Sequence, residues 1–221
     1  MTIDQAAADK LLTTTRSVRK RLDLSRPVPP SLIEECIEVA LQAPTATNAQ
    51  NWAFIVVTEP DKKRAIAEHY RDGWATLRGM GYPPPLPEGD PREDVMPKVI
   101  ESAEYLGGVL DQVPVLVIGC VQGRVVETPL LVMQASTYGS IAPAAWSFML
   151  AARSRGLGSS WTTLHLFHER EVGELLGIPE DWMQVVLLPV AYYTGDDFRP
   201  GHRLPATDLT HWNTWGGRAP S

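Results

Sequence analysis

The sequence of 221 residues predicts one domain in which helices dominate and about four or five strands are interspersed. Apolar residues recur at helical spacing in several segments, and short apolar runs such as VPVLVIGC at 113–120 have the length of buried strands. No internal repeat and no linker divides the chain, which is long enough to bury a sizeable core. We therefore treat 1–221 as a single unit.

The N-terminal part predicts two helices. Asp4 stands where it would cap a helix that runs to Leu12. Ser31 and Glu34 have the spacing of a capping box, and apolar residues follow at helical intervals as far as Leu41. The second of these helices is the clearest in the sequence.

The next part predicts a strand, a helix and a long loop. Pro44 ends the preceding helix, a strand is expected at 53–58, and Pro60 opens another helix. Residues 79–97 are rich in proline and glycine, which is incompatible with a regular element. We interpret this loop as a lid over a binding site, with a plain surface loop as the alternative.

The remaining elements follow in order. We expect an amphipathic segment at 99–110, a strand at 113–120, a helix at 130–154, a short strand at 158–163, a helix at 169–176, a strand at 183–193 and an irregular tail at 194–221. The helix at 130–154 is rich in alanine and serine, which favours close packing against another helix or subunit. The tail carries Trp212 and Trp215, and these side chains need a surface to dock on.

Composition narrows the class of protein. A formal net charge of -6 and a pI near 5.4 argue against a nucleic-acid-binding surface. Cys36 and Cys120 lie in apolar runs and are expected to be buried free thiols in a reducing compartment. No signal peptide and no apolar run of membrane-spanning length is recognisable, so we expect a soluble, cytoplasmic protein.

The usual protein-borne catalytic groups are missing. His165 and His168 are three residues apart, but no other ligand lies at a familiar spacing, so no metal site is predicted. Neither cysteine has polar neighbours that would favour a thiolate. The GLGSS stretch at 156–160 follows a helix and lacks the spacing of a dinucleotide-binding loop. Any chemistry would then belong to a cofactor.

A cluster of cations near the N-terminus predicts a phosphate site. Arg16, Ser17 and Arg19 would place two guanidinium groups and a hydroxyl within one turn, a set that suits a phosphate monoester. A helix end at which cations offset the dipole is an equal alternative from these residues alone. Arg203 is a second candidate phosphate partner, and the polar loop 45–50 could read the edge of a heterocycle.

Four motifs in register resemble the FMN-dependent nitroreductase family. They are TRSVRKRL at 15–22, ALQAPTATNAQNWAFIVV at 40–57, RGLGSSWTTL at 155–164 and GHRLP at 201–205. The resemblance extends over nearly the whole chain. It implies an α+β fold of three layers with a mostly antiparallel central sheet, an intertwined homodimer whose C-terminal tail embraces the partner, and FMN bound between the subunits.

The resemblance also implies the site residues. Phosphate and ribityl contacts would come from Arg16, Ser17, Arg19 and Arg203, contacts beside the ring or the ribityl chain from Pro44, Thr45, Asn48 and Gln50, and donors near the ring from Trp161, Thr162 and Thr163. Tyr82 and Lys20 are candidate substrate contacts. The chain departs from the family at Thr15, where an arginine is common, and at Asn51, where a proline is common. Trp146 and Ser147 stand where the family has a Gln-Asn pair.

The implied activity is an NAD(P)H-dependent reduction by a ping-pong cycle. NADPH or NADH would reduce bound FMN, which would then reduce a nitroaromatic, a quinone or another electron-poor acceptor. Reductive dehalogenation, enone reduction and flavin breakdown are alternatives within the family. A flavin-storage protein without catalysis is an alternative of another class, and nucleic-acid binding through 16–21 is opposed by the net charge.

Overall fold

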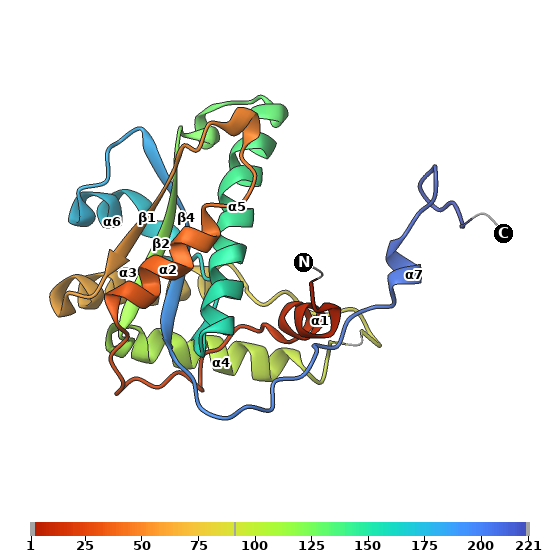
Figure 1. Cartoon of the computed structure of the whole chain (residues 1–221), viewed down its shortest axis with the longest axis horizontal. Helices are drawn as coiled ribbons and strands as arrows, with labels where there is room; N and C mark the ends of the chain where they lie inside the picture. Colours follow the sequence, from red (N-terminus) through yellow and green to blue (C-terminus); the bar gives the residue numbers. More distant parts are fainter. Residues whose placement is uncertain (1–2, 91, 220–221) are drawn as a thin grey trace.

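The computed structural model describes residues 3–90 and 92–219, and it confirms an α+β domain of three layers (Figure 1). The central sheet of the described residues consists of β1 (Trp52–Val57), β2 (Val115–Gln122), β3 (Leu157–Ser159) and β4 (Trp182–Tyr192). Its order is β1-β2-β4-β3, and each neighbouring pair runs antiparallel. The predicted sheet is thus confirmed.

Helices cover both faces of this sheet. One face packs against α2 (Pro30–Ala40) and α5 (Leu131–Ser154), and the other against α3 (Pro60–Gly79), α4 (Met96–Val109) and α6 (Glu169–Leu176). Helix α1 (Gln5–Thr14) lies beside the last turns of α5, and α7 (Ala206–Leu209) lies in the tail, which leaves the body of the domain (Figure 1).

The two central strands are apolar on both faces because both faces are covered. On β2, Leu116 and Ile118 point into the core beneath α3, α4 and α6, whereas Val115 and Val117 point into the core beneath α2 and α5. All four side chains are buried. This alternation explains why the strand reads as one continuous apolar run.

The first two helices begin with different local signals, a side-chain cap in α1 and a proline in α2. Asp4 caps α1, since its carboxylate accepts a hydrogen bond from the backbone N–H of Ala7 at 3.2 Å. The capping box predicted at Ser31 is wrong: α2 begins at Pro30, Pro29 occupies the N-cap, and no side chain caps this end. The fixed φ of a proline at the first helical position is itself a good start.

Other element boundaries shift by one to a few residues. The irregular segment is shorter than predicted, because α3 extends through Gly79 and α4 begins at Met96. The strand expected at 158–163 forms only as β3, after which Thr162 makes a separate bridge to Leu187. Helix α5 packs its small residues against α2, as predicted.

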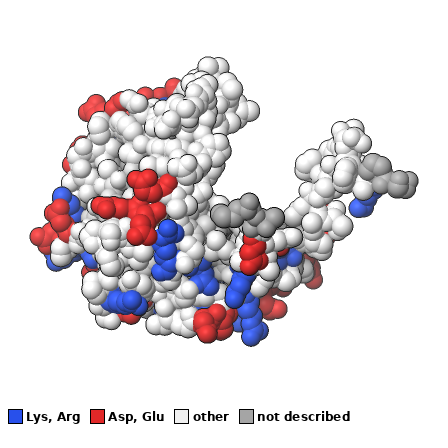
Figure 2. Space-filling view, in the orientation of Figure 1, with Lys and Arg blue, Asp and Glu red and all other residues white. Residues whose placement is uncertain are grey.

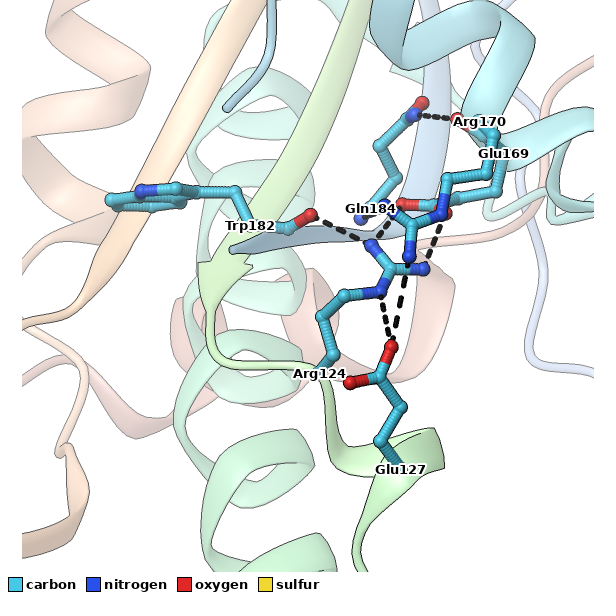
Figure 3. A network of polar contacts seen from close by, with 6 residues as sticks. All are labelled: Arg124, Glu127, Glu169, Arg170, Trp182 and Gln184. Atoms are coloured by element: carbon cyan, nitrogen blue, oxygen red, sulfur yellow. Dashed lines mark hydrogen bonds and ion pairs between the residues drawn. The ribbon is translucent and has the colours of Figure 1, made fainter. Parts of the chain in front are cut away.

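A polar network ties α6 to the end of the sheet (Figure 3). Arg124 pairs with Glu169 at 2.7 Å and with Glu127 at 3.3 Å, and it donates to the carbonyl oxygen of Trp182 at 3.0 Å. Burial alone would raise the pKa of Glu169, but hydrogen bonds from Arg124 and from the Gln184 backbone outweigh burial and lower it. The network fixes the start of α6 on β4.

Within the described residues, every helix is either too short or too polar to cross a lipid bilayer.

The fully buried His165 predicts a specific acid sensitivity. Burial lowers the pKa of His165 to about 3, whereas an unfolded histidine titrates near 6.5. The unfolded chain therefore binds the extra proton between these values, so the free energy of unfolding falls as the pH drops below about 6.5. The loss approaches about 1.4 kcal/mol per pH unit.

Urea unfolding at pH 7, 6 and 5 measures this slope in the wild-type protein and in His165→Leu. The substitution should flatten the pH dependence by up to about 1.4 kcal/mol per unit, whatever it does to stability at pH 7. Parallel slopes in the two proteins would show that His165 does not carry the effect.

Candidate functional site

The segment that follows α1 lies along the edge of the sheet, with residues 16–18 extended and residues 19–22 forming a turn. Its Ser17 forms a parallel bridge to Ser159 of β3, and the backbone N–H of Val18 donates to the Ser159 carbonyl at 2.9 Å. Further on, the N–H of Asp23 donates to the carbonyl of Tyr192 at 2.7 Å. Arg16, Ser17 and Arg19 therefore lie beyond the end of α1.

Gly158 makes this docking possible. A Cβ atom at this position would lie 2.9 Å from Cβ of Val18 and 3.2 Å from Cδ2 of Leu22. Both of these side chains are buried in the core, so they have little freedom to move away. The glycine in the GLGSS stretch thus serves close packing of two backbone segments, and it brings the first and third motifs together.

Arg16 and Arg203 converge at Gly201. A Cβ atom on Gly201 would lie 2.8 Å from Nη1 of Arg203 and 2.9 Å from Nη1 of Arg16, so both guanidinium groups border the same small volume. Arg16 donates to the carbonyl of Arg199 at 3.1 Å, and Arg203 donates to that of His202 at 2.8 Å. No carboxylate of the described residues pairs with either group, which leaves two adjacent cations available for an anion.

A cavity of about 510 Å³ opens beside these two arginines. The predicted residues Arg16, Ser17, Arg19, Trp161 and Arg203 all line it. Residues that sequence reasoning did not assign also contribute, namely Lys98 and Ser102 of α4 and Trp146 and Met149 of α5. A cavity of this size can hold a cofactor fragment, and its floor is basic although the whole chain is acidic.

Thr15 also lines this cavity, and its hydroxyl has a structural role. The side chain is buried and donates to the carbonyl of Leu11 at 2.7 Å, at the end of α1. The residue at the usual arginine position of the family motif is thus engaged in ending the helix.

Arg19 faces a second, smaller cavity as well. This cavity of about 200 Å³ is lined by Arg19 with the predicted Tyr82, Trp161, Thr162 and Thr163, so it adjoins the larger one. Tyr82 is held edge-on against Trp74 with ring centroids 6.2 Å apart. Burial lowers the pKa of Arg19, and the nearby Tyr70 and Tyr82 oppose this shift.

The hydrogen-bond donors of Thr162 are both bonded to the sheet. Its backbone N–H donates to the Leu187 carbonyl at 3.0 Å, and its hydroxyl donates to the same oxygen at 2.8 Å. The backbone N–H groups of Trp161 and Thr163 are the remaining candidates for donors toward a ligand in this segment.

The loop 44–50 lies apart from the arginines. It packs at the other part of α5, where the N–H of Ala46 donates to the hydroxyl of Ser140 at 3.1 Å, and in Figure 1 it stands at the opposite end of the domain from α1. Within one chain, the structure thus does not bring Pro44, Thr45, Asn48 and Gln50 together with Arg16.

The loop 44–50 is nevertheless specifically shaped. Thr47, Asn48 and Gln50 have φ values of 52°, 55° and 49°, in the left-handed region that costs a non-glycine residue about 1 kcal/mol or more. Gln50 donates through its side-chain amide to Asn48 Oδ1 at 3.2 Å and through its N–H to Thr45 Oγ1, also at 3.2 Å. Such strain clusters at functional sites, and these polar groups face solvent.

The candidate substrate contact Lys20 and the motif departure Asn51 both make surface contacts in this structure. Lys20 pairs with Glu101 at 2.5 Å, and both side chains are exposed. Asn51 donates to the carbonyl of Gln122 at 3.3 Å, next to the end of β2. In the part of the chain that the structure describes, no three histidine, cysteine, aspartate or glutamate side chains gather in a manner that could hold a metal ion.

Comparison with known proteins identifies relatives of the whole domain. The family model described as the nitroreductase family matches residues 12–192. The NADH dehydrogenase of Thermus thermophilus is 28% identical over 210 residues, which cover 89% of this chain and 91% of that protein. Iodotyrosine deiodinase 1 of Rattus norvegicus is 39% identical over 59 residues, 27% of this chain and 20% of that protein.

Solved structures agree in fold. Oxidised iodotyrosine deiodinase bound to FMN and 3-iodo-L-tyrosine superimposes with a TM-score of 0.69 at 22% identity, over 93% of this chain and 98% of that one. A BluB-like flavoprotein from Clostridium difficile superimposes with a TM-score of 0.69 at 18% identity, over 94% and 99% of the two chains. An FMN- and NADPH-dependent nitroreductase from a Sphingopyxis strain gives 0.68 at 21% identity, over 93% and 98%.

Because residues 16–22 pack closely against Gly158, we expect a larger side chain at position 158 to destabilise the protein. Gly158→Ala should lower the free energy of unfolding by about 1–3 kcal/mol, because the new methyl group overlaps with Val18 and Leu22. Gly108→Ala in α4 is the matched control, since its Cβ would meet nothing within 4 Å and alanine favours a helix by up to about 1 kcal/mol. Denaturant unfolding of the three proteins checks the difference, and equal stability of the two variants would contradict the packing argument.

Proposed function

Because this chain belongs to the nitroreductase family of NAD(P)H-dependent flavin oxidoreductases, we propose that it binds FMN and uses it to reduce a small electron-poor acceptor. Bound FMN would supply the redox chemistry, taking a hydride from NADPH or NADH and passing it on to a nitroaromatic, quinone or similar acceptor in a second half-reaction. The sequence has no dinucleotide-binding loop, as expected if the nicotinamide nucleotide binds only transiently as a substrate.

The main support for this proposal is the pair of guanidinium groups of Arg16 and Arg203 beside Gly201. Two arginines that border one volume and lack a carboxylate partner among the described residues suit the dianionic phosphate of FMN. The hydroxyl of Ser17 lies in the same cavity and would add a neutral donor. Trp161 lines both cavities, and its N–H with that of Thr163 would stabilise negative charge on the reduced ring.

We further propose that the site is completed by a second copy of this chain. Loop 44–50 has a strained, polar and exposed arrangement but lies away from Arg16 in its own chain. The outer face of α5 is apolar, with Leu131 exposed by 77% and Val132 by 67%, and the tail carries Trp215 exposed by 91%. Figure 2 shows that the upper side of the body facing the tail and most of the tail are white, whereas charged residues gather where the tail joins the body. Such unpartnered apolar surface favours a homodimer.

Reductive dehalogenation of an aromatic ring is the second candidate function. It is favoured by the similarity to iodotyrosine deiodinase both in sequence over 59 residues and in fold. Flavin storage without catalysis would leave bound FMN unresponsive to nicotinamide. The described cysteines, Cys36 and Cys120, are buried and free, and we place the protein in the cytoplasm on the ground that a reducing compartment suits them.

The absorbance spectrum of the purified protein tests the proposal. We expect a flavin spectrum that NADPH or NADH bleaches under anaerobic conditions and that a nitroaromatic or quinone restores. A colourless protein that cannot be loaded with FMN would contradict the proposal, and flavin that no nicotinamide reduces would favour storage.

Removing the paired cations should weaken FMN binding. Arg16→Ala and Arg203→Ala each remove a charge-assisted contact of about 1.5–3 kcal/mol, so we expect the dissociation constant for FMN to rise by roughly 10- to 100-fold. Arg64→Ala is the control, because Arg64 pairs with Asp61 on the exposed side of α3. Quenching of FMN fluorescence measures the three affinities, and an unchanged affinity in both cavity variants would place the phosphate elsewhere.

Mixed dimers test whether two chains share one site. An Arg16→Ala/Arg203→Ala chain and an Asn48→Ala/Gln50→Ala chain should each form FMN-poor homodimers. Co-expressed with different affinity tags, they should form a heterodimer in which one site is intact and the other lacks both halves. We expect about half of the wild-type FMN content in the purified heterodimer. No recovery would mean that both groups of residues serve the same chain.

A further inference from the structure

The first residues of the tail include an aromatic ring that two arginines contact. The guanidinium carbon of Arg21 lies 4.1 Å from the centroid of the Phe198 ring, and that of Arg153 in α5 lies 4.2 Å from it. Tyr193 meets the same ring edge-on, with centroids 4.9 Å apart and an interplanar angle of 90°. Guanidinium groups are attracted to the face of an aromatic ring, most strongly where water is excluded. We call these four residues the tail clamp.

Each arginine of the tail clamp keeps one buried nitrogen without an acceptor among the described residues. These atoms are Nη2 of Arg21 and Nε of Arg153. Burial lowers the pKa of Arg153, and the charge of the nearby Arg21 lowers it further. Asp197 pairs with Arg21 at 2.9 Å, whereas no carboxylate in the described part of the chain pairs with Arg153. The electron-rich face of Phe198 thus offsets part of the cost of bringing two like charges together.

Phe198 is the point at which the tail is held to the body. Among residues 194–200 it is the one that is not exposed, and its ring packs against the core beneath α3, α4 and α6. The N–H of Thr194 donates to the carbonyl of Arg21 at 2.9 Å, but none of the described residues 195–204 forms a hydrogen bond between backbone groups. Side-chain contacts therefore determine the path of this stretch.

The tail clamp lies directly before the two cations at Gly201. The residue after Phe198 is Arg199, whose carbonyl accepts a hydrogen bond from Arg16 at 3.1 Å. The chain then reaches Gly201, beside which the guanidinium groups of Arg16 and Arg203 converge. A displaced Phe198 would shift the Arg199 carbonyl away from Arg16 and would carry Arg203 with it. The convergence of the two cations thus depends on where the clamp holds the tail.

We propose that Phe198 is a positioning residue for the phosphate site, and that the tail clamp holds Arg203 where one phosphate group can contact both it and Arg16. This inference rests on the proposed function, because the phosphate is that of FMN. Phe198 lines neither of the two cavities described above, so it acts on the ligand through the two arginines. It also lies outside the four motifs, so the sequence alone does not reveal this role.

Fluorescence titration of the flavin-free protein with FMN and with riboflavin tests the positioning role. The ratio of the two dissociation constants reports the phosphate contribution alone, because a general loss of structure weakens both flavins. We expect Phe198→Leu to lower the affinity for FMN about tenfold and to leave that for riboflavin unchanged. Phe198→Tyr keeps the ring and should keep the wild-type ratio. Phe167→Leu is the matched control, since Phe167 is a partly exposed aromatic residue of η4 (Leu164–His168), on another part of the domain.

A second variant keeps the test decisive if Phe198→Leu does not fold. Arg153→Gln removes one of the two cations over the ring and should change the same ratio by about threefold. An unchanged ratio in the variant that folds would overturn the inference. An equal loss of affinity for both flavins would also overturn it, because the ring would then support the domain as a whole.

Calorimetric titration with inorganic phosphate separates this inference from the proposed function. In the flavin-free protein, Phe198→Leu should weaken phosphate binding by about the same tenfold factor. If the wild-type protein does not bind FMN but binds phosphate in a manner that depends on Phe198, the proposed function fails and the positioning role stands. If the wild-type protein and Phe198→Leu prefer FMN over riboflavin equally, the reverse holds. A wild-type protein that binds neither FMN nor phosphate would contradict both.

Discussion

The docking of the segment 16–23 against the edge of the sheet is the contact on which the candidate site depends. Backbone hydrogen bonds join it to Ser159 and Tyr192, and Gly158 lets the two backbones approach closely. In the antiparallel bridge between Leu22 and Tyr193, the N–H of Thr194 donates to the carbonyl of Arg21, so the same segment also fixes the start of the tail that carries Arg203. One rigid backbone pairing therefore positions cations that are far apart in the chain.

Concentrating positive charge in an acidic chain has a thermodynamic consequence. Arg16 and Arg203 approach each other without a carboxylate among the described residues, and Arg19 is partly desolvated. Their mutual repulsion and desolvation oppose folding of the ligand-free protein, whereas a bound anion reverses both effects. Ligand binding and stability are thus coupled through these three side chains.

Much of the fold follows from local sequence, and the site follows only in part. Strands that are buried on both faces and helices that begin at a proline can be predicted from the sequence, because each depends on neighbouring residues. The meeting of Arg16 with Arg203 at Gly201 cannot be predicted from the sequence, because it depends on the pairing of the segment after α1 with β3 and on the path of the tail. Lys98 enters the cavity from α4 and belongs to no motif, whereas Trp146 of α5 stands at the position of the family's Gln-Asn pair but has a different side chain, so neither role could be predicted.

The central claim is that the cations around Gly201 recognise the phosphate of FMN, and comparison with riboflavin tests it most directly. Riboflavin has the same ring and ribityl chain but no phosphate. Fluorescence titration of the protein freed of flavin should give an affinity for FMN that is at least about 100-fold higher, as expected for two charge-assisted contacts. Equal affinity for the two flavins would contradict the account, because the paired guanidinium groups would then contribute nothing to recognition.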